Sequence, residues 1–293
     1  MQKIAIFGRN IKESSLPGIK KFFKSIVLFP FEIYVYKPFA ESLINNKIAL
    51  SSQYHTFTNH NQLSNDFKVF YSLGGDGTFL ESVQYVRDKE IPIAGINAGR
   101  LGFLANISQD EICESFKNIL EENYSIERRS LLKFHCEDNP FCEFSYAFNE
   151  VTVQKHDSSL ITIDTYIDGI LLNKYWADGL IISTPSGSTA YSLSTGGPIV
   201  EPECRNIIIS PIASHTLTVR PTAIPDYKKI ELKITSRSDK FLVTIDSRSF
   251  VFGIQKKIKI ELADFNIKII KLPNHTYYDT IRKKLMWGVD IRN

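Results

Sequence analysis

The sequence predicts an α/β N-terminal domain with a mostly parallel sheet, followed by an antiparallel, β-rich C-terminal domain. Three observations predict this fold class. The chain has 293 residues, which exceeds the size at which a single hydrophobic core usually stops growing. Strand and helix patterns alternate over residues 1–125, as they do where helices cover a parallel sheet. From residue 126 onward strand patterns dominate, which favours an antiparallel arrangement.

The first domain, residues 1–125, contains four apolar runs with strand character. They occupy residues 3–8, 31–36, 67–73 and 91–97. Between and after them, apolar residues recur at helical spacing and predict helices over residues 16–28, 78–86 and 110–122. Thr78 and Glu81 have the spacing of a capping box, so we expect the second of these helices to begin at Thr78.

The second domain, residues 126–272, reads as a series of strands. They are expected within residues 131–137, 142–155, 160–176, 179–184, 206–212, 229–235, 240–246, 256–263 and 267–272. Asp168-Gly169 predicts a two-residue hairpin turn. The remaining segment, residues 273–293, has helical spacing over 277–286, and we expect this helix to pack back on the first domain.

Composition and charge exclude several classes of protein. The net charge of +3 and the scattered basic residues do not predict a nucleic-acid partner. The four cysteines have no C-x-x-C spacing, which argues against a zinc or redox site. The longest apolar stretch, residues 25–36, is interrupted by Pro30 and Glu32 and is too short for a membrane span. We therefore expect a cytoplasmic protein without a membrane partner.

The stretch SLGGDGTFLESV, residues 72–83, places three glycines around an aspartate between a strand and a helix. Gly74, Gly75 and Gly77 allow main-chain N–H groups to approach an anion closely, and a helix N-terminus adds partial positive charge. This pattern predicts a phosphate site, although it is neither a P-loop nor a G-x-G-x-x-G motif. Asp76 would repel that phosphate by roughly 4 kcal/mol at 4 Å and an effective dielectric of 20.

Two arrangements remove this repulsion. A magnesium ion can lie between the carboxylate and the phosphate, or the carboxylate can face a hydroxyl. Both belong to phosphoryl transfer, in which an acid orients or deprotonates the attacking hydroxyl. The loop therefore predicts a kinase with Asp76 at the acceptor. The alternative is a tight turn in which Asp76 only caps the helix.

Three further segments are candidates for substrate contacts. The glycine-rich loop at residues 95–103 can bring Arg100 beside the same phosphates, or leave it solvated. Residues 177–200 are rich in Ser, Thr and Gly and contain Tyr191, which suits a sugar and a base. A serine nucleophile would need a G-x-S-x-G elbow, which the sequence lacks. Asn149-Glu150 lies in a strand and suits ribose hydroxyls, although such a pair is also ordinary at a sheet edge.

Together these segments resemble the NAD kinase family. The matching blocks are GGDGTFL (74–80), GINAGRLGFLA (95–105), NEVTV (149–153), DGLIISTPSGSTAYSLSTGGPIV (178–200) and SPIASHTLTVRP (210–221). The first block is shared with diacylglycerol and sphingosine kinases, whereas block 178–200 is highly specific. The resemblance implies phosphorylation of NAD at the 2′-hydroxyl of its adenosine ribose, giving NADP. It further implies ATP or polyphosphate as donor, a divalent ion such as Mg²⁺, and a homodimer or homotetramer.

Carried over by position, the resemblance implies that Asp76 is the proton acceptor, with Gly77 beside it at the substrate. Asn149 and Glu150 would bind the ribose or adenine side of NAD, and Asp178 would contact the dinucleotide. An adenine pocket would be lined by Thr189, Ala190, Tyr191, Ser192, Leu193 and Ser194. The residues expected at the phosphates are Gly74, Gly75, Gly77, Thr78 and Arg100; no residue is assigned to a metal.

Two positions depart from the family pattern. Many relatives carry Thr where Ala98 stands, and Asp-Gly-Gln where this chain has Asp246-Ser247-Arg248. Arg248 would then offer a cationic donor to the ligand in place of an amide, which leaves open the preference for NAD or NADH. A non-catalytic dinucleotide sensor and a lipid kinase that shares the glycine loop are the alternative functions.

Overall fold

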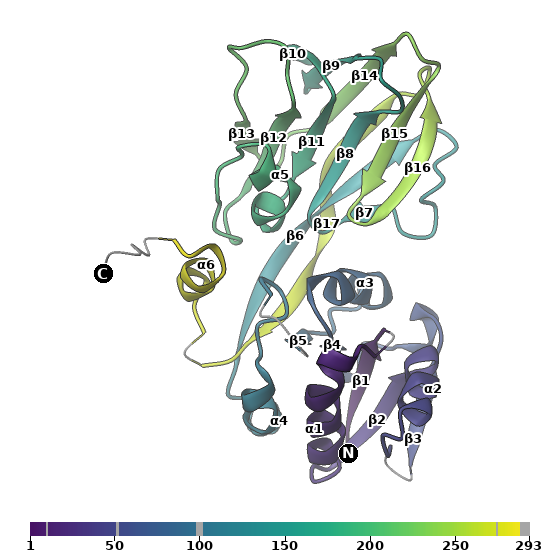
Figure 1. Ribbon diagram of the computed structural model, residues 1–293, viewed down its shortest axis with the longest axis vertical. Helices are drawn as coiled ribbons and strands as arrows, with labels where there is room; N and C mark the ends of the chain where they lie inside the picture. Colours follow the sequence, from purple (N-terminus) through teal and green to yellow (C-terminus); the bar gives the residue numbers. More distant parts are fainter. Residues whose placement is uncertain (10, 51–52, 98–101, 274, 288–293) are drawn as a thin grey trace. The chain divides into compact units, whose positions relative to one another are not determined.

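The computed structural model describes residues 1–9, 11–50, 53–97, 102–273 and 275–287. The chain forms two compact units, residues 1–128 with 267–293, and residues 129–266 (Figure 1). The sequence placed its divisions after residues 125 and 272. The second division instead falls inside strand β17 (Ile258–Lys271), because this strand contributes its first part to one unit and its last part to the other.

The first unit is built on a parallel sheet. Its strand order is β3-β2-β1-β4-β5, and Ile269 at the end of β17 pairs in parallel with Ile93 of β5. The strands are β1 (Gln2–Gly8), β2 (Phe31–Tyr36), β3 (Tyr54–Phe57), β4 (Phe67–Leu73) and β5 (Ile93–Ile96). The order reverses between β1 and β4, because the chain leaves β1 toward β2 on one side and later adds β4 on the other.

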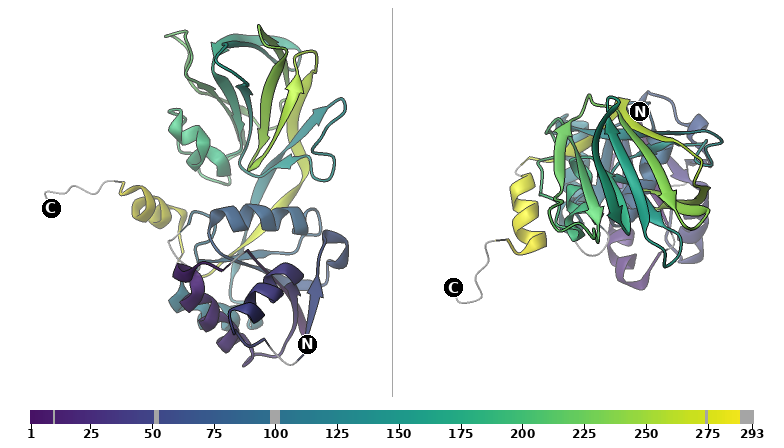
Figure 2. Two further views of the ribbon diagram at one scale, coloured as in Figure 1. Left: turned by 45° about the vertical axis from the view of Figure 1, so that its right-hand side comes forward. Right: turned by 90° about the horizontal axis from the view of Figure 1, so that it is seen from above.

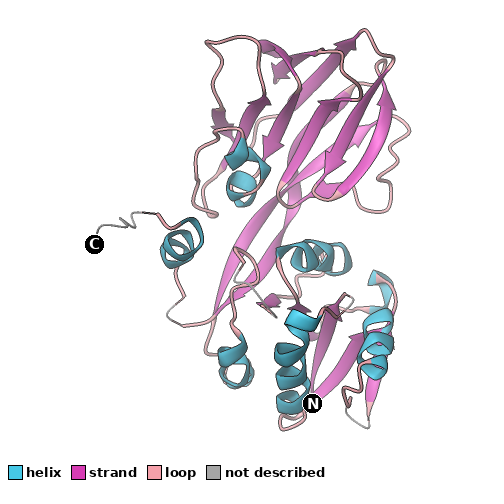
Figure 3. Ribbon diagram, viewed as in Figure 1, coloured by secondary structure: helices cyan, strands magenta, loops and turns pink. Residues whose placement is uncertain are grey.

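Helices supply most of the rest of this unit, whereas the second unit is mainly strands (Figure 3). The α-helices are α1 (Leu16–Ile26), α2 (Lys37–Asn45), α3 (Asp76–Val86), α4 (Ile112–Leu120) and α6 (Tyr277–Leu285). Short 3₁₀ turns are η1 (Glu13–Ser15), η2 (His60–Gln62) and η3 (Gln109–Glu111). None of the helices in the described part of the chain is long and apolar enough to cross a membrane.

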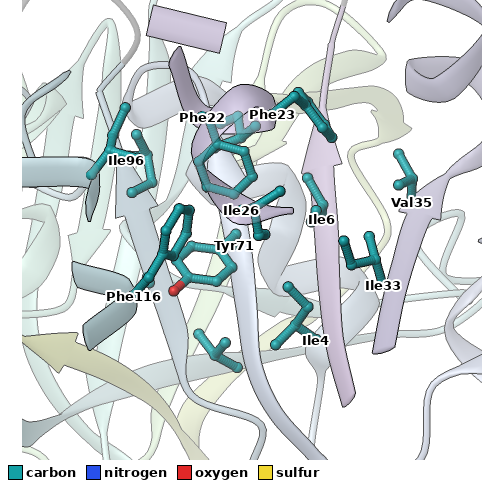
Figure 4. Packing of buried hydrophobic residues seen from close by; sticks show 14 of the residues in the cluster. Ile4, Ile6, Phe22, Phe23, Ile26, Ile33, Val35, Tyr71, Ile96 and Phe116 are labelled. Carbon is teal, nitrogen blue, oxygen red and sulfur yellow. The ribbon is translucent and has the colours of Figure 1, made fainter. Parts of the chain in front are cut away.

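Aromatic residues fill the core on both faces of the parallel sheet. On one face, Phe22 of α1 lies 5.3 Å from the ring of Tyr71 in β4 and 5.1 Å from the ring of Phe116 in α4 (Figure 4). On the other face, Tyr85 of α3 lies 5.0 Å from the ring of Phe7. Such ring pairs contribute about 0.5–1.5 kcal/mol each beyond the area that they bury. The packing fixes α3, and therefore the loop that precedes it, against β1 and β4.

The C-terminal segment belongs to the first unit. Figures 1 and 2 show α6 at the outer side of this unit. His275 lies 2.6 Å from the carboxylate of Glu111, and the Lys284 ammonium lies 5.9 Å from the ring centroid of Phe103. Ile281 is only 2% exposed. These contacts hold the C-terminal helix within the first unit.

The second unit is an antiparallel β structure with two sheets. One sheet has the order β13-β12-β11-β8-β15-β16. The other pairs β10, β9, β14 and the first part of β17, with β6 joined to β17 and β7 joined to β6. The strands are β6 (Ser125–Cys136), β7 (Tyr146–Ala147), β8 (Glu150–Lys155), β9 (Ile161–Ile167), β10 (Ile170–Ala177), β11 (Gly179–Ser183), β12 (Asn206–Ile212), β13 (Thr222–Pro225), β14 (Ile230–Ser236), β15 (Lys240–Ile245) and β16 (Arg248–Gly253). Aliphatic side chains from both sheets form one core. The predicted fold class is confirmed.

Two local expectations were wrong. The capping box at Thr78 does not form: α3 begins at Asp76, Gly75 is its N-cap, and Glu81 pairs with Arg9 instead. The strands expected at 256–263 and 267–272 are a single strand, β17. In contrast, Asp168 and Gly169 adopt φ of 49° and 81° between β9 and β10, as the hairpin prediction requires.

Candidate active site

The glycine-aspartate loop lies at the carboxyl end of β4, where the strand order of the sheet reverses. Gly8 of β1 is in register with Leu73 of β4, and Leu73 with Ile96 of β5. The N–H of Gly74 donates to the carbonyl of Ile96 at 3.0 Å, which joins the loop to the neighbouring strand. In open α/β sheets, ligands bind at such a reversal point, outside the carboxyl ends of the strands.

Of the three glycines of the loop, Gly74 is the one whose side chain would meet a neighbour. A Cβ on Gly74 would overlap the hydroxyl of Thr78, which is buried in the first turn of α3. Gly75 and Gly77 are exposed, and nothing lies within 4 Å of a Cβ placed on either. Since the first N–H groups of a helix have no acceptor within it, this open surface at the start of α3 suits an anion.

The carboxylate of Asp76 is bound to main-chain amides of a second loop. Oδ2 accepts from the N–H of Phe103 at 2.9 Å, and Oδ1 accepts from Leu104 at 2.9 Å and Ala105 at 3.1 Å. A Cβ on Gly102 would overlap Oδ1, so only glycine permits this approach. The amides offset the negative charge that would oppose a phosphate. Because a carboxylate has about four acceptor sites, Asp76 can accept a further hydrogen bond from a hydroxyl.

This anchoring role was missed from the sequence. The two expectations for Asp76 were a base and a cap of its own helix, and the structure adds that it holds residues 103–105 in place. Arg100 and Ala98 lie outside the described residues.

Asn149 and Glu150 belong to a cluster in the second unit. Asn149 precedes β8, and its carbonyl accepts from the N–H of Thr184 at 2.9 Å. The Thr184 hydroxyl donates to the carbonyl of Phe148 at 2.7 Å and accepts from the N–H of Gly187 at 3.1 Å. A Cβ on Gly187 would overlap the Asn149 carbonyl. The hydroxyl-rich segment therefore packs directly against the main chain at the start of the Asn149-Glu150 pair.

Glu150 is a buried acid. It is 8% exposed, and its Oε2 atom has no hydrogen-bond partner among the described residues. Burial, together with the nearby charge of Asp246, raises its pKa to about 8, while the N–H of Tyr191 acts in the opposite direction. A buried acid without a full set of partners suits a ligand hydroxyl.

The predicted adenine-pocket residues span the 3₁₀ turn η4 (Ser186–Thr189) and the short helix α5 (Tyr191–Ser194). Tyr191 is 38% exposed, and its hydroxyl accepts from the Gln154 amide at 3.2 Å. Ser194 is exposed, whereas Thr189, Ala190 and Leu193 are half-buried. Ser192 differs, because its buried hydroxyl lies 3.1 Å from that of Ser210 and so serves internal packing.

Asp178 and Arg248 already have partners in the protein. The carboxylate of Asp178 lies 2.7 Å from the Lys155 ammonium. The Arg248 guanidinium donates to the carbonyls of Phe144 and Tyr146, the latter at 2.8 Å, and lies over the Phe144 ring. Arg248 thus holds the main chain of residues 144–146 in place. The expectation that Arg248 donates to the ligand gains no support from it.

Asp246 is the functional candidate that sequence analysis did not assign. Its carboxylate accepts from the N–H groups of Phe148, Asn149 and Glu150. The sequence offered one sign of this role, because Asp246-Ser247-Arg248 departs from the family pattern. The role itself depends on contacts with residues 148–150, almost 100 positions earlier in the chain. Among the described residues, no group of three or more His, Cys, Asp or Glu side chains could by itself hold a divalent ion.

Comparison with known proteins decides the family. Residues 4–124 match the family described as ATP-NAD kinase N-terminal domain, and residues 148–272 match ATP-NAD kinase C-terminal domain. The chain belongs to the NAD kinase family. Among its relatives, the NAD kinase of Flavobacterium johnsoniae is 42% identical over 99% of this chain and 100% of its own length. That of Bacteroides fragilis is 42% identical over 99% of both chains.

Solved structures share the fold of this NAD kinase family member. Yeast NADH kinase complexed with NADH aligns with a TM-score of 0.88 and 22% identity, covering 100% of this chain and 89% of that one. An NAD kinase from Archaeoglobus fulgidus in complex with ATP aligns with a TM-score of 0.73 and 24% identity, covering 97% and 98%. At these identities the likeness concerns the fold.

Proposed function

We propose that this protein is an NAD kinase that transfers the γ-phosphoryl group of ATP to the 2′-hydroxyl of the adenosine ribose of NAD, giving NADP. Its relatives over the whole chain are named NAD kinase, and neither a sensor nor a lipid kinase finds support among them. The observation that carries the mechanism is the Asp76 carboxylate, held by three amides beside an open glycine loop.

The donor binds at the glycine loop. Gly74, Gly75 and Gly77 give its phosphates access to main-chain N–H groups at the start of α3, and buried Thr78 supports the bend. Arg100 adds positive charge to the same phosphates. The metal enters as part of the substrate MgATP, since phosphate oxygens are its usual ligands.

The acceptor binds to the second unit. Asn149 and Glu150 hydrogen-bond the ribose hydroxyls, and Asp178 contacts the dinucleotide. The adenine packs on the segment from Thr189 to Ser194, with Tyr191 providing the aromatic face. Support comes from the packing of this segment against Asn149 and from the unpartnered, buried Oε2 of Glu150. Arg248 acts on this site indirectly, because it holds the carbonyls of Phe144 and Tyr146 in the segment that leads to Asn149.

Asp76 performs the proton transfer. Its carboxylate accepts the hydrogen bond of the 2′-hydroxyl and takes the proton as the oxygen attacks the γ-phosphorus and the bond to ADP breaks. The three amides keep the carboxylate in one orientation, so that the hydroxyl meets a fixed acceptor. We further propose that the protein is cytoplasmic and that polyphosphate can replace ATP as the phosphoryl donor.

The test is an assay of the purified protein with NAD or NADH as acceptor and with ATP or polyphosphate as donor, each with Mg²⁺. We expect NADP from NAD and ATP. Binding of NAD without formation of NADP would favour the sensor. Phosphorylation of diacylglycerol but not of NAD would favour the lipid kinase and overturn the proposal.

A further inference from the structure

The two-residue turn between β15 and β16, Asp246-Ser247, holds the main chain where β8 begins. Oδ2 of Asp246 accepts from the N–H of Phe148 at 2.9 Å. Oδ1 accepts from Asn149 at 2.7 Å and from Glu150 at 3.3 Å. The N–H of Asp246 returns a bond to the carbonyl of Glu150 at 3.0 Å. One side chain therefore fixes three successive residues.

The position of Asp246 depends on the ladder beside it. Ile245 is in register with Val151, the second residue of β8, and with Arg248 across the hairpin. Asp246 follows with φ of 53°, a left-handed conformation that Asp adopts more readily than most residues. The turn thus continues past the end of the β15–β8 ladder and brings a carboxylate to N–H groups that the ladder does not use.

Arg248, the first residue after the turn, holds the chain that precedes Phe148. Arg248 donates to the carbonyls of Phe144 and Tyr146. From the opposite side, the N–H of Thr184 binds the carbonyl of Asn149 at 2.9 Å. The main chain of Asn149 is therefore held at both its N–H and its carbonyl, which leaves its half-buried side chain as the part that can meet a ligand.

We infer that Asp246 is a positioning residue for the acceptor site: it fixes the main chain of Asn149 and Glu150 so that their side chains are already placed for the ribose of the dinucleotide. This inference rests on the proposed function of that pair. Asp246 itself contacts main-chain amides and acts through the residues that it holds. Fixing polar groups before binding matters because a displacement of about 1 Å can cost up to about 100-fold.

The experiment uses Asp246→Asn in the full-length protein. The new amide NH₂ replaces one acceptor oxygen and opposes a main-chain N–H. By calorimetric titration we expect the Kd for NAD to rise about tenfold, while the Kd for ATP stays within twofold. Asp168→Asn is the matched control. Asp168 is also left-handed in a two-residue hairpin turn and accepts from the N–H of Lys229 at 3.0 Å, and its substitution should leave both constants unchanged.

A double-mutant cycle separates positioning from general destabilisation. If Asp246 acts through Asn149 and Glu150, then adding Asp246→Asn to a variant with both Asn149→Ala and Glu150→Ala should raise the Kd for NAD by less than about twofold. An effect as large as in the wild-type background would overturn the inference. So would equal losses of NAD and ATP affinity, or an unchanged Kd for NAD in the single variant.

Hydrogen exchange in the unmodified protein covers the case in which Asp246→Asn does not fold. We expect the amides of Phe148, Asn149 and Glu150 to exchange as slowly as those of residues 151–155 in β8, and fast exchange would contradict the inference. Failure of the proposed function would look different. It would appear as absence of NADP from the wild-type protein, while these binding and exchange measurements remain decisive for Asp246.

Discussion

The hydrogen bonds of Asp76 determine what a substitution there does. Asp76→Asn removes the proton acceptor and turns an NH₂ group toward at least one of the three amides. We expect kcat to fall by about 10²–10⁴-fold, with KM for NAD within a few-fold. The free energy of unfolding should fall by about 1–2 kcal/mol because one amide loses its acceptor.

Steady-state kinetics and urea unfolding measure the two effects. Asp88→Asn is the control, since Asp88 is exposed beyond the other end of α3. Near-full activity of Asp76→Asn would show that Asp76 is not the base, and Glu150 would be the next candidate.

The raised pKa of Glu150 predicts a pH dependence of stability. The folded protein holds a proton on Glu150 up to a pH of about 8, whereas the unfolded chain releases it near its ordinary value of 4.5. The stabilising contribution is therefore complete below pH 4.5 and is lost as the pH rises to about 8, by at most about 1.4 kcal/mol per pH unit.

Glu150→Gln should remove this dependence and make the variant relatively more stable as the pH rises from 5 to 9. Urea unfolding at several pH values measures it, with exposed Glu114→Gln as control. Parallel curves for wild type and Glu150→Gln would contradict the prediction.

Local motifs single out candidate site residues, because the types and neighbours of the loop glycines and of Asn149-Glu150 are informative. The contacts of Asp76 and Asp246 with main-chain amides could not be predicted in this way. Each depends on partners far away in the sequence, residues 103–105 for Asp76 and residues 148–150 for Asp246. Sequence spacing does not reveal which distant amides a carboxylate meets.

At the scale of elements, the loop that follows β5 depends on Gly102. A methyl group at this position would overlap Asp76 Oδ1 and separate the carboxylate from the amides of residues 103–105. We expect Gly102→Ala to lower kcat at least tenfold and to destabilise the protein by about 1–3 kcal/mol, the usual range for overpacking.

The control is Gly253→Ala, because the nearest atom to a Cβ there is the Asp239 carbonyl at 3.9 Å. Kinetics and thermal unfolding of the two variants give the comparison. Equal behaviour would mean that the loop tolerates the methyl group and that its contact with Asp76 is unimportant.

The spacing of apolar residues along the chain predicted most of the helices and strands of the first unit. Helix α1 and strands β1, β2, β4 and β5 lie where the apolar spacing predicted them, whereas strand β3 and helix α2 were not predicted. The start of α3 was predicted wrongly, because Thr78-Glu81 matches a capping box while Gly75 provides the N-cap and Arg9 binds Glu81. Glu81 therefore binds Arg9, which follows β1, and does not return to the N-terminus of its own helix as a capping box requires.

For the whole molecule, the resemblance to NAD kinases predicts a homodimer or homotetramer. Sedimentation should therefore give a mass of two or four times the 33.4 kDa of the chain. A single species of 33.4 kDa over the concentration range of the assay, with full activity, would show that the monomer suffices.

The order of the α/β and β-rich parts could be predicted, because the alternation of helix and strand patterns gives way to strand patterns near residue 126. The division of β17 between the two units could not be predicted, because the sequence pattern of a strand is the same in both parts.

Strand β17 has a consequence for sequence change in this protein. Residues on either side of its midpoint pair with different neighbours, Ile260 with Ile230 and Ile269 with Ile93. Side chains alternate faces along a strand, so deleting one residue near Phe265 would invert every face on one side of the gap. Conservative replacements along residues 258–271 should be tolerated, while changes in length there should be eliminated by selection.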